Sequence, residues 1–250
     1  MLIKRGLYIA FFLITVSISM WGKVVEFKLD SIPIGSVLRK VTAQPQMIEG
    51  KMALRVELMD EVTNNGKSGI DYGDLPTFVQ IPIEIEDGTI EVDIYARRNG
   101  KGPTEARAFV GLAYHVNADA SVYESVYLRP LNGRKLNPPS PRDKRAVQYY
   151  AYPDWKFDRL RREYPDGRYE VGANIQDNEW ITLKLELDGS RLKVFVNNTQ
   201  VMNIAETKIA PTKGALGLWV DIGTEAWFSN LKVTSKKYRE NTIYSNLKSG

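Results

Sequence analysis

Apolar and polar residues alternate along most of this chain, which is the pattern of half-buried β-strands. The alternation is clearest in the segments 52–58, 89–97, 107–116, 122–129, 145–152, 180–188, 191–196, 214–220 and 227–234. Turn sequences such as Asp87-Gly88, Asn132-Gly133 and Asp188-Gly189 separate them. Strands joined by short turns, with no helices between them, predict an all-β fold of two antiparallel sheets packed face to face.

Helical periodicity is confined to one short stretch, residues 155–162, which Pro165 stops soon afterwards. We therefore expect one short helical turn on a loop. No internal repeat or interdomain linker interrupts the chain, so residues 23–234 are predicted to form a single β-sandwich domain. Residues 235–250 are polar and are predicted to form a C-terminal tail.

The N-terminus predicts a secretory signal peptide over residues 1–22. Lys4 and Arg5 precede the apolar run 7–16, and small serines follow it. A membrane anchor is the alternative, but hydroxyl residues interrupt the run, which is shorter than the roughly 20 apolar residues that span a bilayer. We expect export to the periplasm or the extracellular space, without membrane contact after cleavage.

Composition and charge narrow the classes of partner. The chain has 250 residues, 43% hydrophobic and 26% charged, as expected of a folded domain with a substantial core. Its net charge of +4 falls to +2 without Lys4 and Arg5, and the basic residues are scattered, which argues against a nucleic acid partner. The absence of cysteine excludes disulfides and zinc–thiolate sites.

The C-terminal third carries a recurrent strand pattern, W-x-x-L-x-L, then V-x-V-N, then G-x-[LV]-G-L, then F-x-[ND]-[LIV]-x-V. Its residues are Trp180, Leu183, Leu185, Val194, Val196, Asn197, Gly214, Leu216, Gly217, Leu218, Phe228, Asn230, Leu231 and Val233. The pattern resembles the concanavalin A-like lectin and glucanase superfamily. Within it, the chain is similar to secreted bacterial proteins near the 3-keto-disaccharide hydrolase and laminin-G-like domains. The resemblance covers residues 87–234 and implies a jelly-roll β-sandwich. It implies no single function, because hydrolases, lyases, lectins and inert modules share this fold.

One strand is close to a glycosidase motif. Glu91-Val92-Asp93-Ile94-Tyr95 resembles the E-[ILV]-D-[IV]-E strand of laminarinase-type enzymes. Tyr95 stands where the second catalytic carboxylate of a retaining glycosidase is needed. We therefore interpret this segment as an ordinary strand with a solvated outer face.

Candidate ligand-binding residues concentrate in residues 107–165. Alternation places Tyr123, Ser125, Tyr127 and Arg129 on one face of their strand, where rings can stack on sugars and a guanidinium can bind a carboxylate. The alternative is an aromatic ladder that only stiffens the sheet.

The loop and strand that follow extend this set. The loop from Asn132 to Asp143 holds three prolines and three cations and is expected to form a stiff wall of a groove. Trp155 and Arg159 lie one helical turn apart. Either the ring stacks on a sugar while the arginine binds its charged group, or the two side chains pack on each other and hold the edge of the sandwich closed, as a staple. The predicted substrate-binding residues are Tyr123, Tyr127, Arg129, Asn132, Arg145, Gln148, Tyr149, Trp155 and Arg159.

Two residues are candidates for proton transfer. Alternation places Glu124 on the apolar side of its strand. A buried carboxylate there could be a general acid or base, but we favour a structural ion pair with Arg107 or Arg145. His115 is the only imidazole, so a histidine base at neutral pH would have to be this residue. Packing is the more common role of a single histidine.

Metal and cofactor sites are not predicted. One histidine cannot form a multi-histidine site, and we assign no cofactor and no metal ligand to the groove. The resemblance leaves a structural calcium site as an alternative, because members of the superfamily often carry one. The candidate ligands are Asp71, Asp74, Asp221 and Glu225.

The sequence thus predicts an exported jelly-roll protein that binds a glycan or oligosaccharide, acidic ones included, in a groove lined by tyrosine, tryptophan and arginine. The alternatives are a glycoside or keto-glycoside hydrolase or a polysaccharide lyase that uses the same groove, and a structural module of the cell envelope. The sequence does not determine the oligomeric state.

Overall fold

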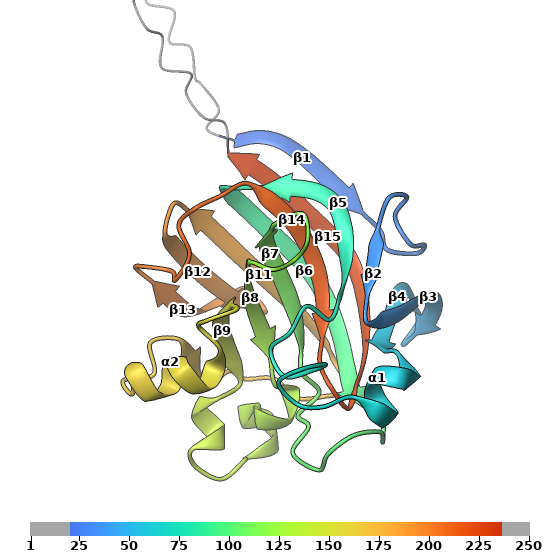
Figure 1. Ribbon diagram of the computed structural model, residues 1–250, viewed down its shortest axis with the longest axis vertical. Helices are drawn as coiled ribbons and strands as arrows, with labels where there is room; N and C mark the ends of the chain where they lie inside the picture. The colour runs from blue at the N-terminus through green and yellow to red at the C-terminus, as the bar shows by residue number, and fades with distance from the viewer. Residues whose placement is uncertain (1–20, 237–250) are drawn as a thin grey trace, which may run out of the picture.

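Two antiparallel sheets pack face to face in the computed structural model, which describes residues 21–236 (Figure 1). The eight-stranded sheet contains β1 (Trp21–Phe27), β3 (Val41–Ile48), β4 (Lys51–Leu58), β6 (Gly88–Arg98), β11 (Trp180–Asp188), β12 (Arg191–Val196), β13 (Thr199–Ile204) and β15 (Thr224–Lys236). The seven-stranded sheet contains β2 (Val37–Arg39), β5 (Phe78–Ile85), β7 (Val110–Val116), β8 (Tyr123–Leu128), β9 (Val147–Tyr152), β10 (Glu170–Val171) and β14 (Gly214–Val220). The predicted jelly-roll sandwich is confirmed.

Strand order is β13-β12-β11-β6-β15-β4-β3 in the first sheet, with β1 paired to β15, and β10-β9-β8-β7-β14-β5-β2 in the second. The helices are α1 (Asp60–Asn65) and α2 (Phe157–Glu163). Three 3-10 helices, Pro130–Asn132, Arg134–Leu136 and Arg142–Lys144, shape the loop between β8 and β9.

The core lies between the sheets and follows the alternation of the sequence. In the pair β11 and β6, Ile181 is opposite Ile94 and Leu183 is opposite Val92, and all four side chains are fully buried. Cross-strand pairs of leucine and β-branched residues stabilise a sheet and present one continuous apolar face. This regularity explains why β6, β11 and β12 could be predicted to within one residue at each end.

The centre of the seven-stranded sheet is buried on both faces, so every residue of β7 and β8 is buried. Val126 and its neighbours face the eight-stranded sheet, and alternation sends Tyr127 to the opposite face. That outer face is covered by the segment 66–77, which crosses in front of the sheet in Figure 1. Trp219 on β14 fixes the segment, because its indole Nε1 donates to the carbonyl of Leu75 at 2.8 Å.

The prediction missed α1 and the strands β1, β2, β3, β5, β10 and β13. β3 and β5 contain Pro45 and Pro82, and β3 is an edge strand with most of its side chains exposed, so alternation is weak there. β15 continues to Lys236 and pairs with β1, so the predicted tail begins inside a strand.

Parts of two sequence predictions lie outside the described residues, namely residues 1–20 of the signal peptide and 237–250 of the tail. Within residues 21–236 no helix is long and apolar enough to cross a membrane.

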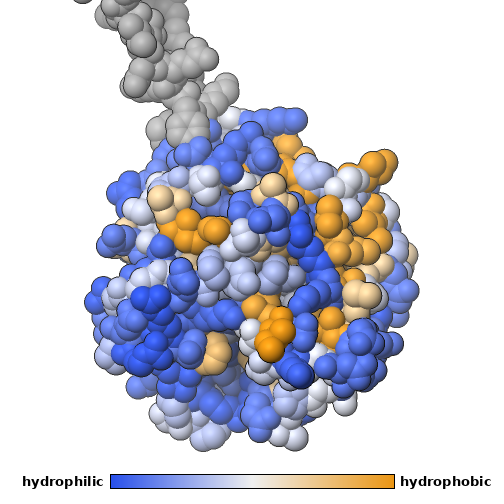
Figure 2. Space-filling model, in the orientation of Figure 1, coloured by the Kyte–Doolittle hydropathy of each residue, from blue (hydrophilic) through white to orange (hydrophobic). Residues whose placement is uncertain are grey.

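The surface differs between the two sides of the molecule. Figure 2 shows apolar residues gathered on the side where β2 lies and hydrophilic residues over α2. Ile34, Val37 and Leu38 contribute to the apolar side, and Ile34 is 99% exposed.

Candidate functional site

A cavity of about 530 Å³ opens at one end of the outer face of the seven-stranded sheet. Tyr127 lines it from β8 and Arg129 from the residue after β8. Asp74 belongs to the covering segment, Phe157 to the start of α2, and Asp221 directly follows β14. We call it the Asp74 cavity. Its size is that of a small-molecule site, and it lies where loops from several parts of the chain meet the sheet.

Two buried carboxyl groups form one wall of this cavity. Asp221 accepts hydrogen bonds from the backbone amides of Gly73 at 3.0 Å, Asp74 at 3.1 Å and Ile222 at 2.7 Å. Asp74 accepts one, from the amide of Phe157 at 3.0 Å, and its backbone has a positive φ of 54°. Asp221 therefore holds the backbone that carries Asp74 in an uncommon conformation.

Burial changes the acidity of both groups. It raises the pKa of Asp74 from 3.8 to about 7, and the charge of Asp221 adds to this effect, while the Phe157 amide opposes it. Burial also raises the pKa of Asp221, although its three backbone donors act in the opposite direction. Asp74 can thus gain or lose a proton near neutral pH, a property that is concentrated at functional sites.

Arg129 and Tyr127 form the second polar wall. Arg129 Nη2 donates to the Tyr127 hydroxyl at 2.8 Å and to Gln148 Oε1 at 3.2 Å, and Arg129 Nη1 donates to Glu170 Oε2 at 2.6 Å. The guanidinium is buried and also lies over the Tyr127 ring, 5.0 Å from its centroid. Burial raises the pKa of Tyr127 well above 10, so its hydroxyl is a proton donor at any ordinary pH.

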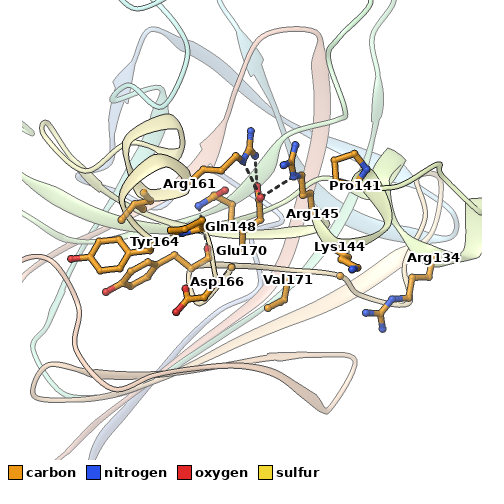
Figure 3. A pocket seen from close by; sticks show the side chains of 15 residues that line it. Arg134, Pro141, Lys144, Arg145, Gln148, Arg161, Tyr164, Asp166, Glu170 and Val171 are labelled. Carbon is orange, nitrogen blue, oxygen red and sulfur yellow. Dashed lines mark hydrogen bonds and ion pairs between the residues drawn. The ribbon is translucent and has the colours of Figure 1, made fainter.

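Glu170 separates the Asp74 cavity from a second pocket of about 540 Å³. Its carboxylate binds Arg129, Arg145 and Arg161, and Figure 3 shows it between the last two. Burial alone would raise the pKa of Glu170, but Arg161 and Arg129 outweigh it and hold the pKa below its usual value. Arg145 and Arg161 line both pockets, so this ion cluster forms their common wall.

Comparison with known proteins assigns the chain to a family. Residues 50–234 match the model of the 3-keto-alpha-glucoside-1,2-lyase-like domain. The chain belongs to this family. The match agrees with the resemblance to 3-keto-disaccharide hydrolase domains, whereas no curated protein matches the chain.

Solved structures share the fold of this lyase-like domain at low sequence identity. A protein of unknown function with a galectin-like fold from Bacillus subtilis is 10% identical, with a TM-score of 0.51 over 87% of this chain and 100% of its own. The carbohydrate-binding module CBM66 from Bacillus subtilis is 18% identical, with a TM-score of 0.48 over 78% of this chain and 96% of its own. The beta-glucanase of Bacillus licheniformis is 13% identical, with a TM-score of 0.48 over 86% and 99%. At such identities the likeness concerns the fold alone.

The structure brings together only part of the predicted binding set. Tyr127, Arg129, Asn132 and Arg145 line the Asp74 cavity. Gln148 lines the neighbouring pocket and accepts a hydrogen bond from Arg129.

Tyr123 shares the outer face but does not line the cavity. It stacks on Tyr152, with ring centroids 5.1 Å apart, and its hydroxyl pairs with that of Tyr150 at 3.0 Å. Tyr149 faces the sandwich interior, where its hydroxyl donates to Glu124 at 2.5 Å. The predicted grouping of Tyr149 with the groove is therefore wrong, because both faces of β9 are aromatic and alternation could not assign them.

Trp155 and Arg159 lie away from the cavity, so the predicted single groove is not formed. Trp155 precedes α2 and is paired with Ala151 through two backbone hydrogen bonds. The Arg159 guanidinium lies 3.8 Å from the centroid of its ring, and Lys208 Nζ lies 4.7 Å away. These contacts match the alternative interpretation of Trp155 and Arg159, in which they pack on each other as a staple.

Glu124 and His115 are buried in the sandwich rather than in the cavity. His115 Nδ1 lies 2.9 Å from Glu124 Oε2, and His115 Nε2 lies 2.9 Å from the carbonyl of Glu86. The predicted partners Arg107 and Arg145 do not bind Glu124. His115 has a positive φ of 54° in a strand irregularity, which turns its side chain off the face that alternation gives it.

The four candidate calcium ligands do not assemble. Asp71 binds Lys40, and Glu225 binds Arg55 and Arg97 on the other sheet, which leaves only Asp74 and Asp221 together. Among residues 21–236 no group of three or more histidine, aspartate or glutamate side chains could hold a metal ion.

Sequence reasoning missed the role of Asp74 and Asp221 in the cavity. Each had one usable signal. Asp221 directly follows the apolar strand β14, and Asp74 follows a glycine in a turn-rich segment. Both are acids in loops next to strands, and functional side chains are often held in such loops.

Proposed function

We propose that this protein cleaves a 3-keto-glycoside by elimination across C1 and C2 of the oxidised sugar, in the Asp74 cavity. The observation that carries the proposal is the buried Asp74 carboxyl, with a pKa of about 7, in the same cavity as the Arg129–Tyr127 pair. The family description names the same reaction class.

The chemistry suits these residues. A ketone at C3 acidifies the hydrogen on C2, and a base that removes this proton leaves an enolate. In this enolate the electron pair of the C2–H bond forms a C2=C3 double bond, with the negative charge on the C3 oxygen. When the C3 carbonyl is restored, that pair forms the C1=C2 double bond, the C1–O bond breaks, and the departing oxygen takes a proton from water. Ionised Asp74 is the base, since a base with a pKa near the working pH is the most effective.

Tyr127 and Arg129 stabilise the enolate oxygen. Tyr127 keeps its proton because of its raised pKa, and Arg129 polarises the hydroxyl through the 2.8 Å hydrogen bond. Donors fixed in a cavity with little water stabilise developing negative charge strongly. Asp221 is a positioning residue, because its oxygens are occupied by backbone amides.

Binding without turnover, the first expectation from the sequence, is the competing function. It needs the rings and guanidinium groups but not a carboxyl that titrates near neutrality, so Asp74 favours a reaction. We keep as part of the proposal that the protein is exported and that the glycan is acidic. Five arginines line the Asp74 cavity, namely Arg107, Arg129, Arg142, Arg145 and Arg161, against three carboxylates, Asp74, Glu105 and Asp221.

The test is the release of p-nitrophenol from p-nitrophenyl 3-keto-α-glucoside, with the unoxidised glucoside as the matched control. Elimination requires the ketone, so we expect release from the keto sugar only. With deuterium at C2, we expect slower release and loss of the label from the sugar product. Release from the unoxidised glucoside, or full retention of the label, would contradict elimination. Saturable binding of the keto sugar with no release would favour the binding function instead.

A further inference from the structure

A third hollow, of about 450 Å³, adjoins the Asp74 cavity and is lined by Arg98, Arg107 and Arg142. We call it the arginine hollow. Arg98 comes from the end of β6, Arg107 from the loop before β7 and Arg142 from the proline-containing loop before β9. Pro138 and Pro139 form part of the wall, and none of the residues that line the hollow is acidic.

Within residues 21–236 no acidic side chain forms an ion pair with any of the three cations of this hollow. Arg107 Nη1 donates to the carbonyls of Thr104 at 2.7 Å and Ala106 at 2.9 Å. Arg142 donates to Asn132 Oδ1 at 3.0 Å and to the carbonyl of Leu131 at 2.9 Å. In the described part of the chain all these acceptors are neutral. Arg129, Arg145 and Arg161, by contrast, share Glu170.

Glu105, the acid that acts on Arg107, does not neutralise the hollow. Glu105 is exposed and feels the charges of Arg107 and Arg98, but its carboxylate accepts a hydrogen bond from Thr104 Oγ1 at 3.0 Å. Burial lowers the pKa of Arg107, and repulsion from Arg142 and Arg98 lowers it further. The three positive charges therefore repel one another, and a bound oxyanion would reduce this repulsion.

The arrangement of the hollow is suited to a ligand with several oxygens. Guanidinium groups present paired N–H donors that match the oxygens of a carboxylate or a sulfate. Arg107 and Arg142 are anchored by their own hydrogen bonds, and the two prolines stiffen the wall, so little order has to be created on binding.

The arginine hollow borders the Asp74 cavity, because Arg107 and Arg142 line both. The geometry points to a subsite here for an oxyanion, a carboxylate or a sulfate ester, carried by a sugar unit next to the one that reacts. This inference rests on the proposed function for the position of the reacting sugar. It assigns the negative charge of the substrate to a particular place on the protein.

The test compares two unoxidised disaccharides of the same linkage, glucuronosyl-glucose and glucosyl-glucose, by titration calorimetry. They lack the ketone, so binding is measured without turnover. We expect the charged sugar to bind about tenfold more tightly, as charge-assisted hydrogen bonds to a fixed site should give. The double substitution Arg98→Gln with Arg107→Gln should bring the ratio of the two dissociation constants close to one.

Two further variants keep the test decisive. Arg162→Gln removes an exposed arginine of α2 and should leave the ratio unchanged. Arg98→Gln alone changes an exposed side chain, so it should fold normally and lower the ratio by about threefold. Equal binding of both sugars by the wild type, or a preference that survives the double substitution, overturns the subsite.

Inorganic sulfate at the same ionic strength distinguishes a free anion from a sugar-linked one. Sulfate that binds as tightly as the charged disaccharide would overturn the sugar-linked assignment. Weak competition by sulfate supports it. If p-nitrophenyl 3-keto-α-glucoside is not cleaved but the charge preference is present, elimination fails and the anion subsite stands.

Discussion

The carboxylate of Asp221 accepts a hydrogen bond from the backbone amide of Asp74 at 3.1 Å, so one buried acid fixes the position of the other. A carboxylate saturated by three backbone donors keeps its charge more easily than one with a single donor. The pair therefore divides its roles. Asp221 holds the segment, and Asp74 is left with free capacity to exchange a proton in the cavity.

Asp74→Asn should abolish most of the elimination activity, since the amide cannot accept the C2 proton. We expect kcat to fall by about 100-fold or more, the usual scale for removal of a general base. In the wild type, kcat/KM should rise with pH through about 7 as Asp74 ionises. Initial rates on the keto substrate between pH 5 and 9 measure both effects. A pH profile that is flat across this range would contradict the role of Asp74.

Tyr127→Phe should lower kcat with little change in KM, because the lost hydroxyl acts on the enolate more than on bound substrate. Removal of one donor of this kind typically costs about 100-fold in kcat. Tyr123→Phe is the matched control, as its hydroxyl lies on the same sheet face but pairs with Tyr150. Similar kinetics for the two variants would show that Tyr127 does not act on the substrate.

Asp74 should also make folding stability depend on pH. The pKa of its carboxyl is raised from 3.8 to about 7 on folding, so between these values the unfolded state loses its proton first. Stability therefore falls as the pH rises through this range. Asp74→Asn removes this contribution and should unfold at a higher urea concentration than the wild type at pH 8, with the gap closing toward pH 4. A gap that does not change with pH would show that Asp74 does not titrate in this range.

Glu170→Gln should destabilise the protein at pH 7 by about 3 kcal/mol, since it leaves the buried Arg129 without its anion. The lowered pKa of Glu170 stabilises the folded state above the usual value of 4.5, and this contribution is lost as the pH falls below it. Urea unfolding at pH 7 and pH 3 should show a larger difference between variant and wild type at pH 7 than at pH 3.

Glu163→Gln is the control for that comparison. It breaks an exposed pair with Arg159 one helical turn away, which contributes about 0.5 kcal/mol or less. A loss of stability in Glu170→Gln no larger than in this control would mean that the arginine cluster is already solvated.

Alternation of polar and apolar residues predicts the fold well because most strands bury one face against the other sheet. It places Tyr127 and Arg129 on one face, and both line the Asp74 cavity, Tyr127 from β8 and Arg129 from the residue that follows β8. It fails where the backbone departs from the pleat, as at His115, and where both faces are buried, as at Tyr149. Alternation could not predict that Asp74 and Asp221 lie together, because they are far apart in the sequence and meet only when a loop folds over the sheet.

Glu124 tests whether a residue that the sequence offers as catalytic is instead structural. Its carboxylate is bound by Tyr149 and His115 in the interior, and the Tyr149 hydroxyl in turn accepts from the amide of Lys208 at 2.7 Å. Glu124→Gln should therefore lower the free energy of unfolding by about 2 kcal/mol, the scale for an unsatisfied buried group. Cleavage of the keto substrate per folded molecule should stay close to that of the wild type. A loss of activity in fully folded Glu124→Gln protein would instead support the acid–base role, which was the less favoured interpretation of its sequence position.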